Sequence, residues 1–149
     1  VSPADGKVLQ ILPLTDPDGE AAGHSISIFL SIFDVHVNRA PIGGRLKALE
    51  YRRGKFKVAF DDEASRVNEQ NVLTIQGEQM LVVMKQIAGL IARRVICWKK
   101  PGHPLERGEP IGLIRFGSRV EIVVPKRVRL RIGVGDRLKG GSSILGEYL

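Results

Sequence analysis

The 149-residue chain has a single cysteine, Cys97, so no disulfide can form within it, and its apolar neighbours predict a small buried residue. Aromatic residues make up only 5% and do not alternate with basic ones, so we expect no nucleic-acid partner. No apolar run approaches the roughly 20 residues of a membrane-spanning helix. His24, His36 and His103 lack metal-binding spacing and no Gly-rich phosphate loop is present, so we predict neither a metal nor a cofactor held by such a loop.

The chain is rich instead in residues that favour short strands and turns. It contains 17 Gly and 8 Pro, and short runs of Val and Ile recur between them. A hydrophobic content of 43% and a charged content of 26% are typical of a globular protein. We predict one compact, mostly β domain (β-rich α+β) over residues 1–149, sandwich-like or barrel-like, with little helix.

The positive charge is concentrated towards the C-terminus. Residues 93–149 hold 13 of the 23 Lys and Arg but 5 of the 16 Asp and Glu, a net charge of +8. Such a segment attracts an anionic partner, and we expect an anionic membrane surface. An alternative is a non-catalytic β-sandwich module that binds an anionic lipid or another anionic partner.

Apolar alternation predicts the strands. Within residues 24–32, Ile and Leu alternate with Ser and Phe, which predicts a strand with one buried face. The apolar positions are Ile26, Ile28, Leu30 and Ile32. Residues 72–76 and 79–87 predict a hairpin that turns at Gly77-Glu78. Further strands are expected at 7–12, 45–51, 90–98 and 128–132, a loop at 13–23, and a short helix or ordered loop at 61–71.

A Gly-Ser pair interrupts the strand-like stretch of residues 112–125. A glycine inside a strand pattern marks a bulge, a bend or a close approach of two backbones. The hydroxyl of Ser118 therefore lies next to the Gly117 carbonyl, in a geometry that suits a self-cleaving serine and an ordinary bulge alike. Gly141-Ser142 is a second, weaker candidate because little chain follows it.

A reactive serine needs a base and an orienting acid. Asp5 and His36 both lie beside turn signals, and Asp, His and Ser can form a triad in any chain order. Other roles stay open, because Asp5 before Gly6 is a common turn residue and His36 can be a half-buried histidine with satisfied hydrogen bonds. The residues alone leave the triad as one of several alternatives.

Three motifs in order resemble those of the phosphatidylserine decarboxylases, in particular their short form, which includes archaetidylserine decarboxylase-like members. The motifs are SPADG at residues 2–6, FDVHVNRAP at 33–41 and FGSRV at 116–120. The segments NEQN at 68–71 and IAGLIARR at 87–94 extend the resemblance over nearly the whole chain.

The resemblance implies a proenzyme that cleaves itself between Gly117 and Ser118. Ser118 would attack the Gly117 carbonyl, while His36 accepts the hydroxyl proton. Asp5 would hold the His36 imidazole in the required tautomer. β-Elimination from the resulting ester would leave a covalent pyruvoyl group at position 118, at the head of an α chain of residues 118–149. Residues 1–117 would be the β chain, and the two chains would stay together.

The resemblance also implies the reaction. The amine of phosphatidylserine, or of a related serine phospholipid, would form a Schiff base with the pyruvoyl group, which accepts the electrons released with carbon dioxide. The product would be phosphatidylethanolamine. Phe33, Arg115 and Arg119 are the candidate substrate contacts, although Arg119 can equally be an outward-facing structural residue. The long form has a histidine where this chain has Phe33, and a threonine where it has Arg119.

We further expect an enzyme at the cytoplasmic face of the cell membrane, peripheral or anchored by a segment outside these residues. The chain has no initiator Met and opens within a motif, so we expect it to be a piece of a longer one. Edge strands in a small β domain predict a dimer. Turns at 106–112 and 134–146 resemble those of biotinyl and lipoyl domains, which predicts barrel-sandwich-type hairpins.

Overall fold

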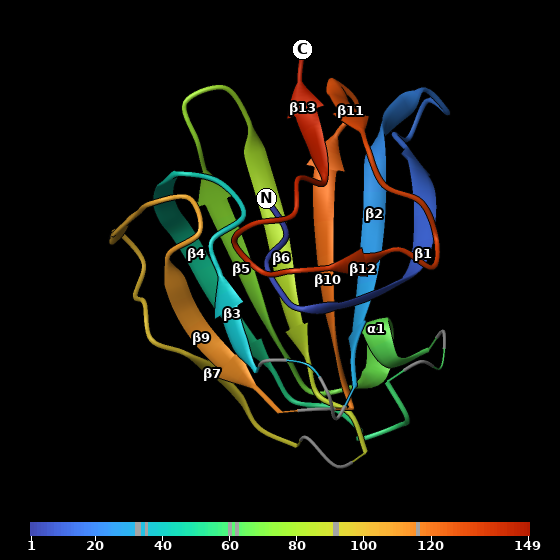
Figure 1. The fold of residues 1–149 in the computed structure, drawn as a ribbon, viewed down its shortest axis with the longest axis vertical. Helices are drawn as coiled ribbons and strands as arrows, with labels where there is room; N and C mark the ends of the chain where they lie inside the picture. The colour runs from blue at the N-terminus through green and yellow to red at the C-terminus, as the bar shows by residue number, and fades with distance from the viewer. Residues whose placement is uncertain (32–33, 35, 60, 62, 91–92, 116) are drawn as a thin grey trace.

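Strands make up almost all of the regular structure, as Figure 1 shows. The computed structural model describes residues 1–149 except 32, 33, 35, 60, 62, 91, 92 and 116. Within these residues there is one helical turn, α1 (Ala64–Val67), and no helix is long and apolar enough to cross a membrane. The predicted mostly β class with little helix is confirmed.

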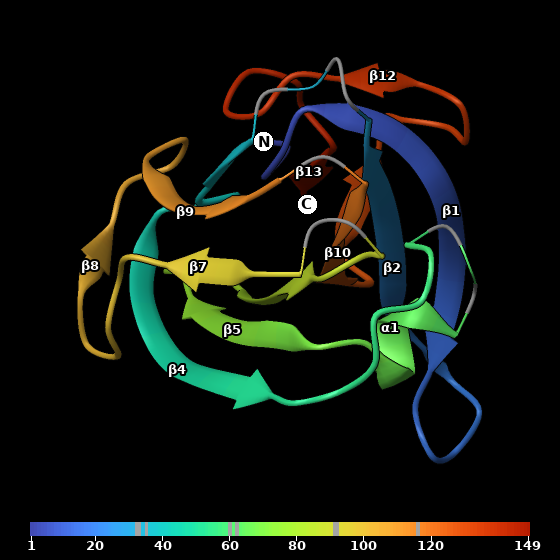
Figure 2. The same cartoon turned by 90° about the horizontal axis from the view of Figure 1, so that it is seen from below.

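Eight antiparallel strands form the main sheet, which curls into an open half-barrel (Figure 2). In spatial order they are β12 (Arg137–Leu138), β1 (Gly6–Thr15), β2 (Ala21–Leu30), β10 (Ser118–Pro125), β6 (Leu81–Ile87), β5 (Gln70–Gln76), β4 (Gly44–Arg52) and β8 (Pro104–Leu105). β10 lies in the middle of this sheet, so both of its edges carry ladder hydrogen bonds, to β2 and to β6.

Two smaller sheets complete the fold. β3 (Val37–Arg39), β9 (Pro110–Ile114) and β7 (Val95–Cys97) form one, and β11 (Val128–Leu130) and β13 (Gly146–Tyr148) form the other. Ile111 and Ile114 of β9 pack in one buried cluster with Leu30, Met84 and Val120 of the main sheet. The three-stranded sheet therefore lies against the concave face of the half-barrel, and apolar burial between the two sheets holds them together.

The structure corrects several predicted boundaries. The hairpin across Gly77-Glu78 forms as predicted, but the loop predicted at 13–23 is shorter, because β1 continues to Thr15 and β2 begins at Ala21. Of the strand predicted at 90–98, residues 91 and 92 lie outside the described residues, and among the others Val95–Cys97 form a strand. β2 is also buried on both faces, since Ser25 and Ser27 are covered as fully as the apolar residues, and the predicted position Ile32 lies outside the described residues.

Several connections gather at one end of the half-barrel, at the bottom of Figure 1. They are the residues that follow β2, β4, β6 and β9, together with α1. We call this end the junction end. The Gly-Ser pair predicted as a cleavage site lies here, because β10 begins at Ser118.

Candidate functional site

The Gly117-Ser118 bond joins the two larger sheets. β9 of the three-stranded sheet ends at Ile114, and β10 of the main sheet begins three residues after Arg115. Gly117 has φ +74°, in the left-handed region that glycine adopts readily. The predicted break in the strand pattern is therefore a passage between sheets, with a glycine at the turn.

Ser118 is fully buried, with 0% of its surface exposed. It shares a face of β10 with Val120, two residues on, which belongs to the core between the sheets. Its hydroxyl donates a hydrogen bond of 2.6 Å to the Arg115 carbonyl. In this arrangement the hydroxyl proton is directed at the peptide backbone.

His36 lies beside this junction. It immediately precedes β3, and its carbonyl accepts a 3.1 Å hydrogen bond from the Ile114 amide at the end of β9. At the other end of the same connection, the Leu30 carbonyl accepts a 2.6 Å bond from the Gly117 amide. These two hydrogen bonds join the end of β9 to the residue before β3, and the end of β2 to the residue before β10.

Asp5 reaches the same end of β2 from its other edge. It immediately precedes β1, in which Lys7 pairs with Phe29 of β2. Ser118 pairs with Leu30 on the opposite edge of β2. The register thus places Asp5 and Ser118 on opposite edges of the Leu30 end of β2, while His36 is bonded to Ile114, four residues before Ser118.

The Asp5 carboxylate also has a structural partner. Its Oδ1 accepts a 2.7 Å hydrogen bond from the Gly140 amide, 135 residues away. This bond ties the turn before β1 to the turn-rich segment after β12. The Oδ2 atom of Asp5 is left to orient His36. The contact with Gly140 is therefore compatible with both predicted roles of Asp5, as a turn residue and as an orienting acid.

Arg119 points away from the core face and is nonetheless only 2% exposed. Its guanidinium donates to Ser27 Oγ at 2.7 Å and to Gln10 Oε1 at 3.3 Å. It also donates to the carbonyls of Ala59 at 3.5 Å and Asp61 at 3.4 Å. The side chain therefore binds the segment before α1 onto the outer face of the main sheet. It points outwards and has structural contacts, as in the structural alternative, but this segment covers it.

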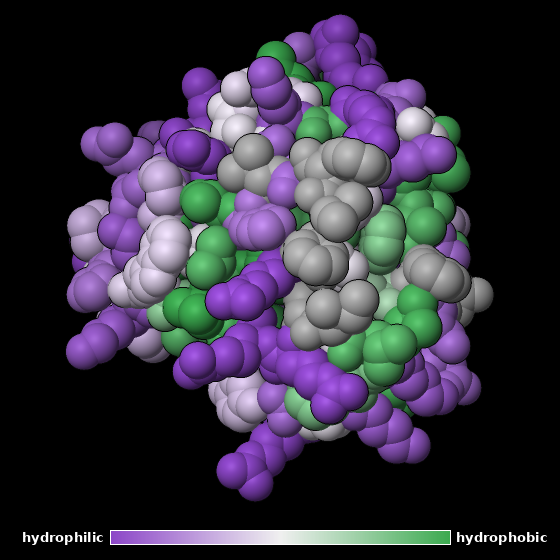
Figure 3. Space-filling view, turned by 60° about the horizontal axis from the view of Figure 1, so that its bottom comes forward, coloured by the Kyte–Doolittle hydropathy of each residue, from purple (hydrophilic) through white to green (hydrophobic). Residues whose placement is uncertain are grey.

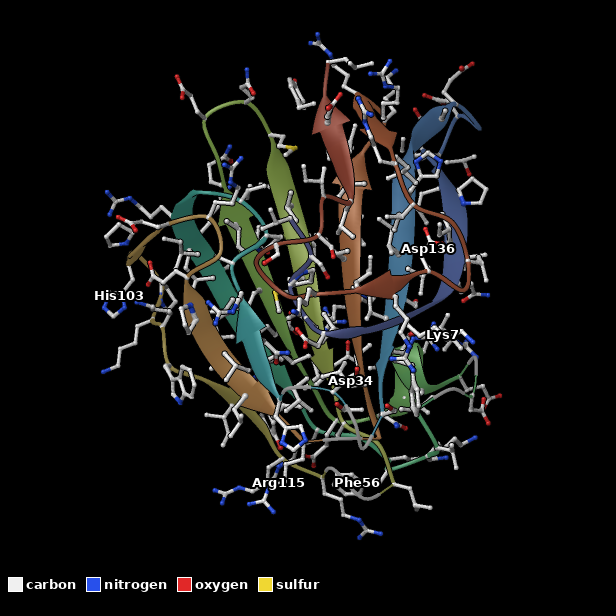
Figure 4. All side chains as sticks on the ribbon, in the orientation of Figure 1. Lys7, Asp34, Phe56, His103, Arg115 and Asp136 are labelled. Carbon is white, nitrogen blue, oxygen red and sulfur yellow. The ribbon has the colours of Figure 1, made fainter. Side chains whose placement is uncertain are left out.

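Of the other two predicted substrate contacts, Arg115 and Phe33, the structure describes only Arg115. Arg115 is exposed and lies at the junction end, where Figure 4 labels it near Phe56. Phe33 lies outside the described residues. Of the three predicted contacts, Arg115 is thus the described cation that is open to an approaching ligand.

Asp34 is a charged residue near His36 that the sequence reasoning did not single out. Its Oδ2 accepts a 2.6 Å bond from the Ser31 amide, and its Oδ1 lies 3.5 Å from Arg137 Nη1. The carboxylate is 9% exposed and faces the same end of the sheet (Figure 4). The sequence pointed to Asp34 only through its position in the FDVH motif, two residues before His36. It fixes the connection that carries His36.

Two further predictions concern reactive groups away from the junction. Cys97 is half-buried, and this burial raises the pKa of its thiol, which weakens it as a nucleophile at neutral pH. Among the residues the structure describes, no group of three or more His, Cys, Asp or Glu could hold a metal ion. The metal-free site remains a prediction.

Comparisons with known proteins show the family of the chain. The family model described as phosphatidylserine decarboxylase matches residues 1–146. A phosphatidylserine decarboxylase proenzyme of Solibacter usitatus is 46% identical over 149 residues, which are all of this chain and 70% of that protein. Proenzymes of the same name from Chlorobium chlorochromatii and Geotalea uraniireducens are 43% and 46% identical, over 99% and 98% of this chain and 70% and 69% of their own lengths. None of the solved structures matches. The chain belongs to the phosphatidylserine decarboxylase family.

Proposed function

We propose that this chain cleaves itself between Gly117 and Ser118 and that the product decarboxylates phosphatidylserine or a related serine phospholipid. The observation that supports the proposal is that Asp5 and Ser118 flank the Leu30 end of β2, while His36 is bonded to the end of β9, which leads to Ser118. The rival pair Gly141-Ser142 has a similar glycine conformation, φ +77°, but its serine is exposed in a turn. Burial of the serine therefore favours Gly117-Ser118.

Cleavage begins when the Ser118 hydroxyl turns from the Arg115 carbonyl towards the base. His36 takes the proton as Oγ forms a bond to the Gly117 carbonyl carbon, and the proton passes to the Ser118 nitrogen as the C–N bond breaks. The peptide has then become an ester. Loss of the Ser118 α-proton then breaks the Cβ–Oγ bond, and Oγ leaves as part of the Gly117 carboxylate. The enamine that remains becomes an imine, and addition of water to the imine releases ammonia.

A pyruvoyl group fits position 118 because its three carbons are those of Ser118. The Cα and Cβ become its ketone carbon and methyl group, Oγ leaves, and an oxygen from water takes the place of the nitrogen, so the group needs no more room than the buried serine occupies. When present, it supplies a carbonyl that accepts the electrons released with carbon dioxide. Burial of this position excludes water and favours loss of the substrate carboxylate.

The two product chains are expected to stay together. β10 would belong to the α chain, yet it is the central strand of the main sheet, with β2 and β6 of the β chain on its two edges. Cleavage before Ser118 leaves the pairs from Arg119 onwards, to β2 and to β6, in place. A dimer through an edge strand such as β8 or β12 remains a prediction.

We also propose that the junction end faces the lipid surface at the cytoplasmic face of the membrane. Exposed basic residues gather here: Arg52 at the end of β4, Arg53 and Lys55 after it, Arg93 and Arg94 after β6, and Arg115 after β9. Val58 and Leu90 of the same connections are 37% and 50% exposed. Figure 3 shows hydrophobic atoms bordered by hydrophilic ones on this side. Basic residues around exposed apolar ones suit an anionic bilayer.

Cleavage is tested on a denaturing gel. The wild-type chain should separate into fragments of 117 and 32 residues, the smaller with a blocked N-terminus, and release carbon dioxide from phosphatidylserine. Ser118→Ala should remain whole and inactive. Ser142→Ala, which alters the exposed Gly-Ser pair, should be cleaved like the wild type. A wild-type chain that stays whole and inactive would leave only the anionic-binding alternative.

Membrane docking is tested by sedimentation with phosphatidylserine-containing vesicles. Arg93 stacks on Phe56 at 5.0 Å at the junction end, and Arg127 stacks on Tyr148 at 5.1 Å at the opposite end, so the two offer a matched pair. Arg93→Glu with Arg94→Glu should weaken binding, whereas Lys126→Glu with Arg127→Glu should leave most of it. Equal losses would mean that overall charge, and not this end, directs binding.

A further inference from the structure

Gly89 lies against the bond that is proposed to break. It is buried and comes two residues after the end of β6. The preceding residue, Ala88, is held on both sides: its amide donates to the Glu69 carbonyl at 2.9 Å, and its carbonyl accepts from Asn68 Nδ2 at 2.7 Å. The backbone that presents Gly89 is therefore fixed.

No side chain fits at position 89, and the obstacle is the scissile carbonyl. A Cβ on Gly89 would lie 1.8 Å from the Gly117 oxygen, 3.0 Å from the Gly117 carbonyl carbon and 3.3 Å from the Ala59 Cβ. Gly89 does not have a positive φ, so its backbone conformation alone would accept alanine. Glycine is required here because two backbones approach closely.

We propose that Gly89 is a positioning residue for self-cleavage, holding the Gly117 carbonyl in the orientation that Ser118 attacks. This inference rests on the proposed function. In the attack, the Ser118 Oγ–C bond forms, the C–N bond to Ser118 breaks, the hydroxyl proton moves to that nitrogen, and the Gly117 oxygen carries the charge in between. The amide of Gly117 is pinned to Leu30, and its carbonyl oxygen rests on Gly89, so both sides of the residue are fixed.

The fold offers a matched control in Gly23. It is buried, and a Cβ there would lie 2.0 Å from the Val124 oxygen, at the far end of the same strand, β10. Its φ of +156° makes alanine at least as costly for folding as at position 89. Gly23→Ala thus introduces a comparable backbone clash into β10 without touching the scissile bond.

The experiment follows cleavage of full-length Gly89→Ala and Gly23→Ala on a gel, with thermal unfolding of each measured in the Ser118→Ala background. A displaced carbonyl should slow cleavage in Gly89→Ala about 100-fold. Hydroxylamine, which cuts esters, should not speed the release of fragments from it, because formation of the ester is the slowed step. Gly23→Ala should lose a similar amount of thermal stability and still be cleaved near the wild-type rate.

Three results would overturn the inference: cleavage of Gly89→Ala within a few-fold of wild type, equal slowing in Gly23→Ala, or faster release of fragments from Gly89→Ala in hydroxylamine. A wild-type chain that never cleaves would instead overturn the proposed function itself. If Gly89→Ala does not fold, Ala59→Val is the second variant, because the Ala59 Cβ lies 3.3 Å from where a Cβ on Gly89 would be and a larger side chain there crowds Gly89. A folded Ala59→Val that is cleaved at the wild-type rate would also refute the role of this contact.

Discussion

Replacing Arg119 with methionine separates two roles for the residue after the scissile bond. Methionine keeps an unbranched apolar stem of similar length but removes the guanidinium. The substitution is best made in the Ser118→Ala chain, so that one uncleaved polypeptide unfolds. If Arg119 mainly holds the sheet to the segment before α1, stability should fall. If it mainly binds lipid phosphate, stability should not change.

The size of the loss follows from the contacts. The 2.7 Å bond to Ser27 Oγ comes from a charged donor, and such bonds contribute about 1.5–3 kcal/mol each. The longer bonds, to Gln10, Ala59 and Asp61, span 3.3–3.5 Å and together add about 1–2 kcal/mol. Only one partner of each bond is removed, so the buried acceptors lose their donor. We expect a loss of about 3–5 kcal/mol.

Urea unfolding measures this loss. A change of that size lowers the midpoint by about 2 M for a typical dependence on denaturant. Arg115→Met is the control, because Arg115 is exposed at the same end and its replacement should change stability by about 0.5 kcal/mol or less. An unchanged midpoint for Arg119→Met, with a raised KM for lipid in the otherwise wild-type enzyme, would refute the structural role.

Further expectations follow from single contacts. Gly117→Ala has room for its methyl group but must hold φ +74°, which costs about 1–2 kcal/mol, so a gel should show slower cleavage in a folded chain. Asp5→Asn keeps an acceptor for the Gly140 amide but loses the charge, so cleavage should slow with little change in melting temperature, whereas Asp5→Ala should lower both. Because burial raises the pKa of Cys97, its thiol stays protonated at neutral pH, and alkylation by iodoacetamide should accelerate only above the ordinary thiol pKa of 9.0. Gln86→Leu removes the bonds of a buried amide to Asn38 and Asn71, at 2.9 and 3.0 Å, and should cost about 2–4 kcal/mol in urea unfolding.

The local pattern was sufficient where local chemistry decides the structure. Gly77-Glu78 lies between two alternating runs, and the hairpin formed there because turn residues and strand alternation act over a few positions. The three motifs selected Asp5, His36 and Ser118, of which Asp5 and Ser118 flank the Leu30 end of β2. Their catalytic roles rest on the family resemblance and stay predictions.

The pattern was insufficient where distant segments decide. An arginine in an alternating strand reads as solvent-exposed, and Arg119 is buried only because residues from the segment before α1 cover it. Gly89 gives no local signal either, since its φ is ordinary and its constraint is a carbonyl 28 positions away in sequence. The passage between sheets at Gly117 was likewise invisible, because a strand pattern does not specify its partner strand.

The position of the cleavage site reconciles two opposing demands. The bond must be accessible to rearrangement before cleavage, and the new N-terminus must be rigid afterwards. A bond inside β10 would be too constrained to rearrange, and one at Arg115 would leave a loose leader ahead of the reactive residue. At Gly117-Ser118, a left-handed glycine precedes the bond, and Arg119 follows it with ladder bonds on both edges and a buried guanidinium. Strand pairing on both edges therefore begins at Arg119, one residue after the group that reacts. This pairing holds the new N-terminus in place.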